Sequence, residues 1–175
     1  MRSVLHVHSP TASGPETARS VATWLLRAAD DVDSARAEWE TRKVALLRCG
    51  RVFAAIRLPA DIVFAAARSE RPVLVGHYLA VALHGGAVFV DKTAAWYYCL
   101  VPPGTCRDWR MPGTDCLDDD HFLGVPRVDV TGPENRSYWC VVPAFPEALC
   151  RPDAVAHLVE LGRFRRTHGP EAKDD

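Results

Sequence analysis

The residues with the clearest potential for chemistry are three consecutive aspartates and a histidine, Asp118-Asp119-Asp120-His121. Adjacent carboxylates can hold a divalent cation such as Mg²⁺ or Mn²⁺ against phosphate groups, and an imidazole can add a ligand. Alternation along a strand would place only Asp118 and Asp120 on one face. With Asp115 and His121 they form a candidate metal site. Three acids at the tip of a hairpin also form solvated turns, and a turn is our first interpretation.

Aromatic side chains form a second candidate site. Trp96, Tyr97 and Tyr98 are consecutive in an apolar run with strand character. Alternation places Trp96 and Tyr98 on one face of that strand and Tyr97 on the other. A pair of exposed rings can stack on nucleobases, whereas a buried pair belongs to the core, and at least one face is expected to be core.

Basic side chains cluster at one place in the sequence. Arg163, Arg165 and Arg166 surround Phe164 near the end of the last predicted helix. Cations at a helix C-terminus complement the helix dipole, which is the simplest interpretation. A phosphate-binding patch and a partner surface are the alternatives.

Several common sequence signatures are absent from the chain. Neither G-x-G-x-x-G nor G-x4-G-K-[ST] occurs, so nucleotide binding through the Rossmann or P-loop arrangement is not expected. G-x-S-x-G and H-E-x-x-H are also missing, which removes two large classes of hydrolase.

Length and charge restrict the remaining classes. The chain has 175 residues, of which 48% are hydrophobic, and this suits one domain with one core. Twenty-one Lys and Arg oppose 22 Asp and Glu, so any binding to nucleic acid needs a local patch. The sequence has no signal-peptide pattern and no run of about 18 apolar residues. We therefore expect a soluble cytoplasmic protein that does not bind membranes.

Six cysteines are spread over the chain. Without an export signal they are expected to be reduced and mostly buried. Zinc sites usually contain closely spaced ligand pairs, and the spacing C-x6-C-x9-C-x4-H from Cys99 to His121 has none. We expect no resident cofactor, and Mg²⁺ or Mn²⁺ is the ion that the aspartates would bind.

The apolar pattern predicts one domain over residues 14–166, preceded by a flexible arm at 1–13 and followed by a polar tail at 167–175. Helices are expected at 15–30, at 33–41 with Asp33 as the cap, at 60–69, at 72–83 and after Pro152, where Phe164 would be buried. Strands are expected at 44–47 and 52–58 as one hairpin, at 87–90 and 96–101 as another, and at 115–117, 121–125 and 138–142. This order predicts an α+β fold whose mostly antiparallel sheet is flanked by helices.

Three segments resemble the bifunctional DNA primase/polymerase N-terminal family of the archaeo-eukaryotic primase superfamily. They are Arg51-Val-Phe-Ala-Ala-Ile-Arg-Leu-Pro59, Ala95-Trp-Tyr-Tyr-Cys-Leu-Val-Pro-Pro-Gly104, and Asp115-Cys-Leu-Asp-Asp-Asp-His-Phe-Leu-Gly-Val-Pro126 followed by Tyr138-Trp139. The resemblance covers about residues 15 to 162 and implies a primase-like fold.

The resemblance also implies where the family's catalytic groups should lie, and the sequence departs from that pattern. The family's metal-binding strand carries two acids, but the matching strand at 52–58 has none. Trp96 stands where a phosphate-contacting histidine is expected. Asp115 matches the acid of the family's third motif, whereas Asp118, Asp120 and His121 occupy positions at which the family has glycines.

These departures favour a catalytically inactive primase/polymerase-like domain that binds nucleic acid, a nucleotide or a protein partner in a regulatory role. One alternative is a protein-interaction or dimerisation module that binds no nucleic acid. The other is a residual metal-dependent nucleotidyl or phosphoester enzyme that uses Asp118, Asp120 and His121.

Overall fold

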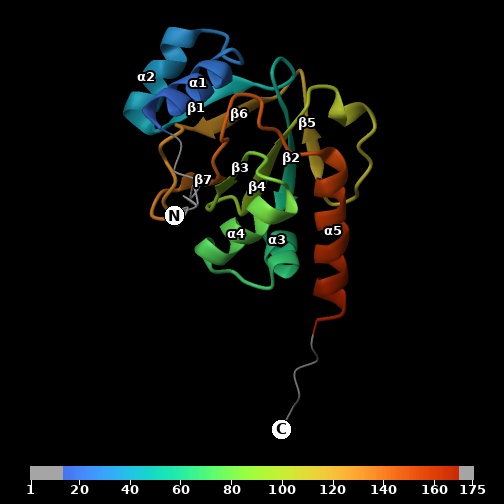
Figure 1. Ribbon diagram of the computed structural model, residues 1–175. Helices are drawn as coiled ribbons and strands as arrows, with labels where there is room; N and C mark the ends of the chain where they lie inside the picture. Colours follow the sequence, from blue (N-terminus) through green and yellow to red (C-terminus); the bar gives the residue numbers. More distant parts are fainter. Residues whose placement is uncertain (1–13, 170–175) are drawn as a thin grey trace, which may run out of the picture.

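A computed structural model describes residues 14–169, so the predicted arm at 1–13 and most of the predicted tail lie outside the described part of the chain. The helices are α1 (Pro15–Leu26), α2 (Val32–Arg42), α3 (Ala60–Ala67), α4 (Pro72–Ala82) and α5 (Pro152–Thr167), with a short 3-10 turn η1 (Thr105–Arg107). The strands are β1 (Val44–Arg48), β2 (Ala54–Pro59), β3 (Val88–Asp91), β4 (Trp96–Val101), β5 (Asp115–Leu117), β6 (Phe122–Pro126) and β7 (Ser137–Val141). The predicted α+β class with antiparallel sheets and flanking helices is confirmed (Figure 1).

The main sheet has five strands in the order β5-β2-β4-β3-β7, and all of its pairings are antiparallel. The predicted hairpin of β3 and β4 is present. One face packs against α3, α4 and α5, with Ile56, Val63, Leu79 and Leu158 in its core. The other face packs in part against α1 and α2.

The predicted hairpin of residues 44–47 and 52–58 is wrong. β1 pairs with β6 in a separate two-stranded sheet, in which Val44 lies opposite Pro126. The chain turns at Gly50, whose positive φ of 99° suits glycine, and then enters the main sheet as β2. The apolar pattern predicts both strands correctly, but the partner of β1 lies about eighty residues away, and local spacing carries no signal for such a contact.

Two tryptophans fix the small sheet to the rest of the molecule. The indole N–H of Trp39 in α2 donates to the carbonyl of Val125 at 3.0 Å, and that of Trp139 in β7 donates to the carbonyl of Pro126 at 3.0 Å. Both rings are buried, so these bonds satisfy polar groups that would otherwise be costly. β6 is therefore held from two sides.

Three local predictions about the helices need correction. α1 ends at Leu26, earlier than expected, because the chain turns before Asp31. Asp31, not Asp33, caps α2 by accepting a hydrogen bond from the Ser34 backbone N–H at 3.1 Å. Phe164 is 60% exposed, because it lies on the outer side of α5.

No helix within residues 14–169 is both long enough and apolar enough to cross a membrane.

The closest helix contact generates a test of the packing between α3 and α5. A Cβ added at Gly162 would collide with the carbonyl oxygen of Ile62 and lie 2.9 Å from its Cγ2. Gly162→Ala should lower the free energy of unfolding by about 1–3 kcal/mol, as overpacking does, although Gly→Ala inside a helix usually stabilises it. Urea unfolding measures the change, and a more stable variant would contradict the described contact.

Candidate groove on the open sheet face

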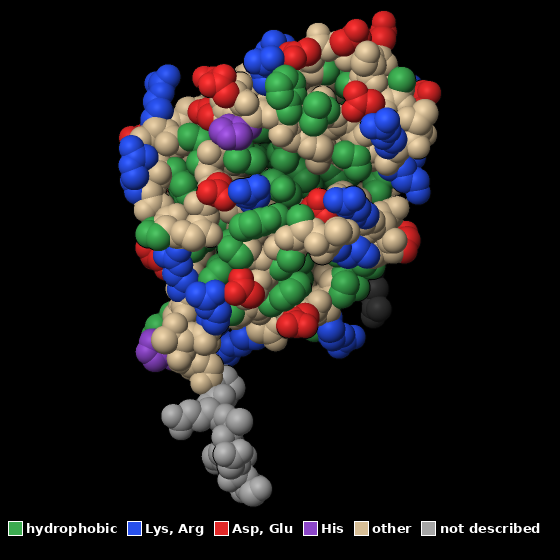
Figure 2. Space-filling model, turned by 180° about the vertical axis from the view of Figure 1, so that it is seen from behind, with side chains coloured by type: hydrophobic (Ala, Val, Ile, Leu, Met, Phe, Trp, Pro, Cys, Tyr) green, Lys and Arg blue, Asp and Glu red, His purple; other side chains and the backbone are tan. Residues whose placement is uncertain are grey.

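A row of side chains crosses the main sheet on the face that α1 and α2 cover only in part. The register places Arg57 of β2 beside Asp115 of β5 and beside Tyr98 of β4, and Tyr98 beside Phe89 of β3. Phe89 in turn lies beside Trp139 of β7. The row therefore changes from charged at β5 to apolar at β7. Figure 2 shows this face as a hollow with a largely hydrophobic floor, along which Lys or Arg side chains lie next to Asp or Glu side chains.

Arg57 is the central charged residue of this face. Its Nη2 lies 2.7 Å and its Nε 3.2 Å from the same oxygen, Oδ2 of Asp115. Its guanidinium carbon also lies 4.5 Å from the centroid of the Trp96 ring, a cation–π geometry. The hydrogen bonds to Asp115 raise the pKa of Arg57 above its usual value, so this cation is permanent.

One hollow of about 430 Å³ opens beside Tyr98. Its cationic lining comes from Arg42 and Lys43 at the end of α2 and from Arg136 just before β7. Asp91 lies among them, 3.5 Å from Arg136, and accepts hydrogen bonds from two backbone N–H groups of the β3–β4 turn. Burial raises the pKa of Tyr98, so its hydroxyl stays neutral at physiological pH.

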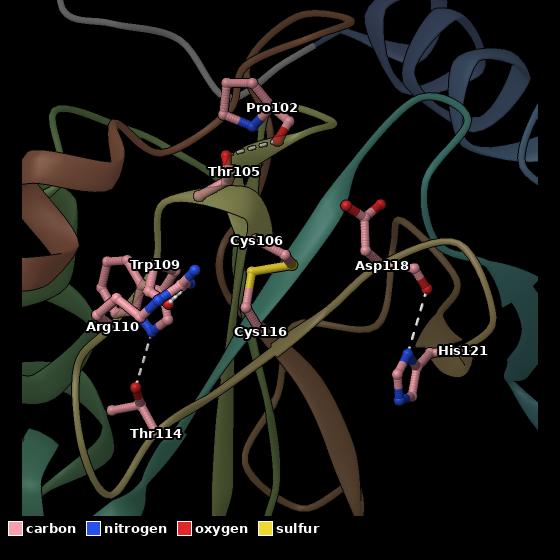
Figure 3. Close-up of a disulfide and its surroundings, with 9 residues drawn as sticks. All are labelled: Pro102, Thr105, Cys106, Trp109, Arg110, Thr114, Cys116, Asp118 and His121. Atoms are coloured by element: carbon pink, nitrogen blue, oxygen red, sulfur yellow. Dashed lines mark hydrogen bonds between the residues drawn. A yellow bond between two sulfur atoms is a disulfide. The ribbon is translucent and has the colours of Figure 1, made fainter.

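A second hollow, of about 440 Å³, lies at the β5 end of the same row. Arg57 and Asp115 form part of its lining, and the loop between η1 and β5 supplies Trp109 and Arg110. The indole N–H of Trp109 donates to the hydroxyl of Thr114 at 2.9 Å, which closes this loop on itself (Figure 3). We call the two hollows and the row between them the groove.

The groove carries an excess of positive charge in a chain whose net charge is -1. Its lining has two carboxylates, Asp91 and Asp115, and each forms an ion pair with an arginine. Five cationic side chains line the same surface: Arg42, Lys43, Arg57, Arg110 and Arg136. Such a surface attracts anionic ligands locally, as the overall composition requires.

The acidic segment forms a turn, as our first interpretation predicted. Asp119 and Asp120 connect β5 to β6. The backbone N–H of His121 donates to the carbonyl of Asp118 at 2.8 Å, and the His121 ring faces that carbonyl rather than the carboxylate (Figure 3). Within residues 14–169 no three His, Cys, Asp or Glu side chains converge as metal ligands, and Asp115 is paired with Arg57 instead.

The basic cluster of α5 lies on the helix-covered side and makes structural contacts. Arg165 donates to the carbonyl of Ala66 near the end of α3, and Arg166 forms an ion pair with Asp61 at 2.7 Å. Arg163 lies 3.6 Å from the sulfur of Met111. The structure therefore does not bring these arginines to the aromatic face.

Trp96 and Tyr98 do share a face, as predicted, but their exposure differs. Trp96 is partly exposed, whereas Tyr98 is 9% exposed and stacks on Phe89 with ring centroids 4.9 Å apart. Sequence reasoning missed Arg57, although an arginine in the apolar run 52–58 was a visible signal. It also missed Arg42 and Arg136, which long-range packing brings together.

The expectation of six reduced cysteines is wrong for one pair. Cys106 in η1 and Cys116 in β5 form a disulfide, with Cα atoms 5.3 Å apart (Figure 3). The loop between them folds back on the sheet edge, which the linear spacing does not reveal. For a loop of this length a disulfide contributes on the order of 3 kcal/mol of stability. The other four are free, as expected: Cys49, Cys99 and Cys150 are buried and Cys140 is partly buried.

Comparison of the chain with protein-family models, with curated proteins and with solved structures finds no match.

The free thiols generate a prediction about reactivity. Burial raises the pKa of Cys49 and of Cys140 to about 12, and the charge of Asp118 contributes at Cys49. At pH 8 about one thiol in ten thousand would be ionised, and only the thiolate is alkylated. In the native protein both residues should react with iodoacetamide at least about a thousandfold more slowly than in urea. Peptide mass spectrometry measures both rates, and equal rates would contradict the described burial.

Proposed function

We propose that this chain is a catalytically inactive, primase/polymerase-like module that binds single-stranded nucleic acid in the groove. The segments that resemble the family's metal-binding and phosphate-contacting motifs correspond to β2, β4 and β5, which are adjacent in the sheet. Arg57, Tyr98 and Asp115 of these strands line the groove. The proposal therefore uses the same surface that the resemblance implies.

The ion pair of Arg57 with Asp115 supports the absence of catalysis. Two-metal transfer needs carboxylates that converge on the metal ions and neutralise charge at the reacting phosphates. Here β2 contributes a cation, and that cation occupies Oδ2 of the one matching acid at 2.7 Å. A fixed positive charge at this point opposes binding of Mg²⁺ and favours a phosphate.

The remaining features of the groove suit a single strand. Trp96 presents a partly exposed ring on which a base can stack, and Arg57 covers part of it. Arg42, Lys43 and Arg136 lie at the far end of the row, where a backbone phosphate can be bound. Aromatic rings combined with a cationic track are the usual means of binding single strands without sequence preference.

Binding of a single strand in the groove can be tested by its dependence on salt. A fluorescent oligothymidine of about 12 nucleotides, within the usual range of site sizes, should bind more weakly as salt rises. Arg136→Ala should weaken binding and reduce the salt slope by about 0.7, the value for one phosphate contact on a single strand. Trp96→Ala should cost about 1–3 kcal/mol of binding free energy through lost stacking. Fluorescence anisotropy measures all three effects.

Arg71→Ala is the charge-matched control, because Arg71 is exposed at the start of α4, which packs on the opposite face of the sheet. It should bind the oligonucleotide as the unaltered chain does. Equal losses in Arg71→Ala and Arg136→Ala, or no binding at low salt, would refute the proposed groove function.

Catalysis is tested separately. We expect no extension of a primed template with deoxynucleotides in Mg²⁺ or Mn²⁺. Extension that is lost in both Asp118→Ala and Asp120→Ala would instead support the residual enzyme. Polyacrylamide gel electrophoresis of a labelled primer measures the extension.

A protein-interaction role is the second candidate, because α4 presents an apolar outer side. Val73 is 71%, Leu74 46% and Val81 77% exposed, and Pro72–Ala82 contains no charged residue. Exposed apolar patches of this kind often mark contacts with other proteins. Light scattering after gel filtration would detect self-association, and Val81→Glu should then give a monomer. A monomer at all concentrations would exclude the dimeric version.

A further inference from the structure

The disulfide occupies an accessible position at the edge of the main sheet. Cys106 and Cys116 are both partly exposed, and the loop between them carries exposed residues such as Arg107 and Arg110. β5 is the edge strand, and it pairs with β2 through three residue pairs alone. Both cysteines pack against the helix-side core, but neither is fully buried, so a small thiol can approach the pair from solvent.

The remaining cysteines differ from this pair. Burial raises the pKa of Cys49 and of Cys140 to about 12, and a hydrogen bond that the Cys99 thiol donates to the sulfur of Cys150, together with burial, raises the pKa of Cys99. Protonated, buried thiols do not attack disulfides. Cys150 is buried as well, so exchange with solvent thiols favours Cys106 and Cys116.

We propose that Cys106 and Cys116 are a reversible thiol–disulfide exchange site, whose opening releases the loop at residues 107–114 from the wall of the groove. The co-reactant is a small thiol of the glutathione class. Arg107 follows Cys106 directly, and Arg110 lies in the same loop. These cations attract an anionic thiol and favour the thiolate form of a neighbouring cysteine.

The exchange proceeds in two steps. The thiolate of one small thiol attacks a sulfur of the pair, the S–S bond breaks, and the other cysteine leaves as a thiolate that takes up a proton. A second small thiol attacks the mixed disulfide and frees the first cysteine. Two small thiols thus supply two electrons and two protons, and they leave as one small-molecule disulfide.

Besides the disulfide, the loop is held by apolar packing of Trp109 and Met111 against the helix-side core and by a small number of polar contacts. Trp109 and Thr114 bond within the loop itself, and Met111 contacts Arg163 of α5 at 3.6 Å. With the disulfide open, the three residue pairs between β5 and β2 keep Cys116 in place, so the pair can close again. The loop from 107 to 114 then loses its covalent anchor at Cys106.

The exchange can be tested with the full chain in buffers that contain reduced and oxidised glutathione at varied ratios. After acid quenching, thiols are alkylated under denaturing conditions and counted by intact mass. We expect the number of labelled cysteines to rise from four to six in a single reversible transition. Limited trypsin digestion of the same samples should cleave after Arg110 several-fold faster when the pair is open. This result does not depend on whether the groove binds nucleic acid.

Variants separate the two parts of the proposal. Cys106→Ser and Cys116→Ser should be cleaved rapidly in every buffer, whereas Cys140→Ser, the matched control, should respond as the unaltered chain does. A disulfide that remains closed in excess reduced glutathione would overturn the exchange site. So would a change in the labelling of any of the other four cysteines between the buffers. An open pair with an unchanged rate of cleavage after Arg110 would overturn the release of the loop.

Discussion

The structure depends on how the other elements cover the two faces of the antiparallel main sheet. One face of the main sheet is largely buried under α3, α4 and α5, and the other is buried under α1, α2 and the small sheet only at one end. Ala55 and Leu100 mark the covered end, whereas Arg57 and Trp96 mark the open end of the same strands. The groove is the part of the apolar face that no element within residues 14–169 covers.

An uncovered sheet face needs polar groups that are compatible with water, and the register supplies them. Arg57 lies between Asp115 and Tyr98 on neighbouring strands, so one side chain can form an ion pair, lie near a buried phenol and cover Trp96. At this exposure the ion pair contributes little to stability, about 0–1 kcal/mol. Its larger effect is electrostatic, because it places a permanent cation at the point where a primase-like enzyme would need negative charge.

The sequence predicted those features whose causes are local. Prolines at the first turns of α1, α4 and α5 and the alternation in β3 and β4 identified these elements. Contacts between distant segments could not be found in this way. The pairing of Val44 with Pro126 and the closure of Cys106 on Cys116 depend on the path of the whole chain. The aromatic face was foreseen, but the cations opposite it, at the end of α2 and before β7, were not.

The three residues of β5 contribute side chains to both faces of the main sheet. Because side chains alternate, Asp115 and Leu117 lie on the groove side, while Cys116 lies on the side of the helices. The carboxylate that holds Arg57 and the sulfur that anchors the loop are therefore one peptide unit apart. The three residue pairs between β5 and β2 hold both Asp115 and Cys116 in the sheet, so the carboxylate keeps its position beside Arg57. The proposed exchange would therefore take place next to the ion pair of the groove, on the opposite side of the same strand.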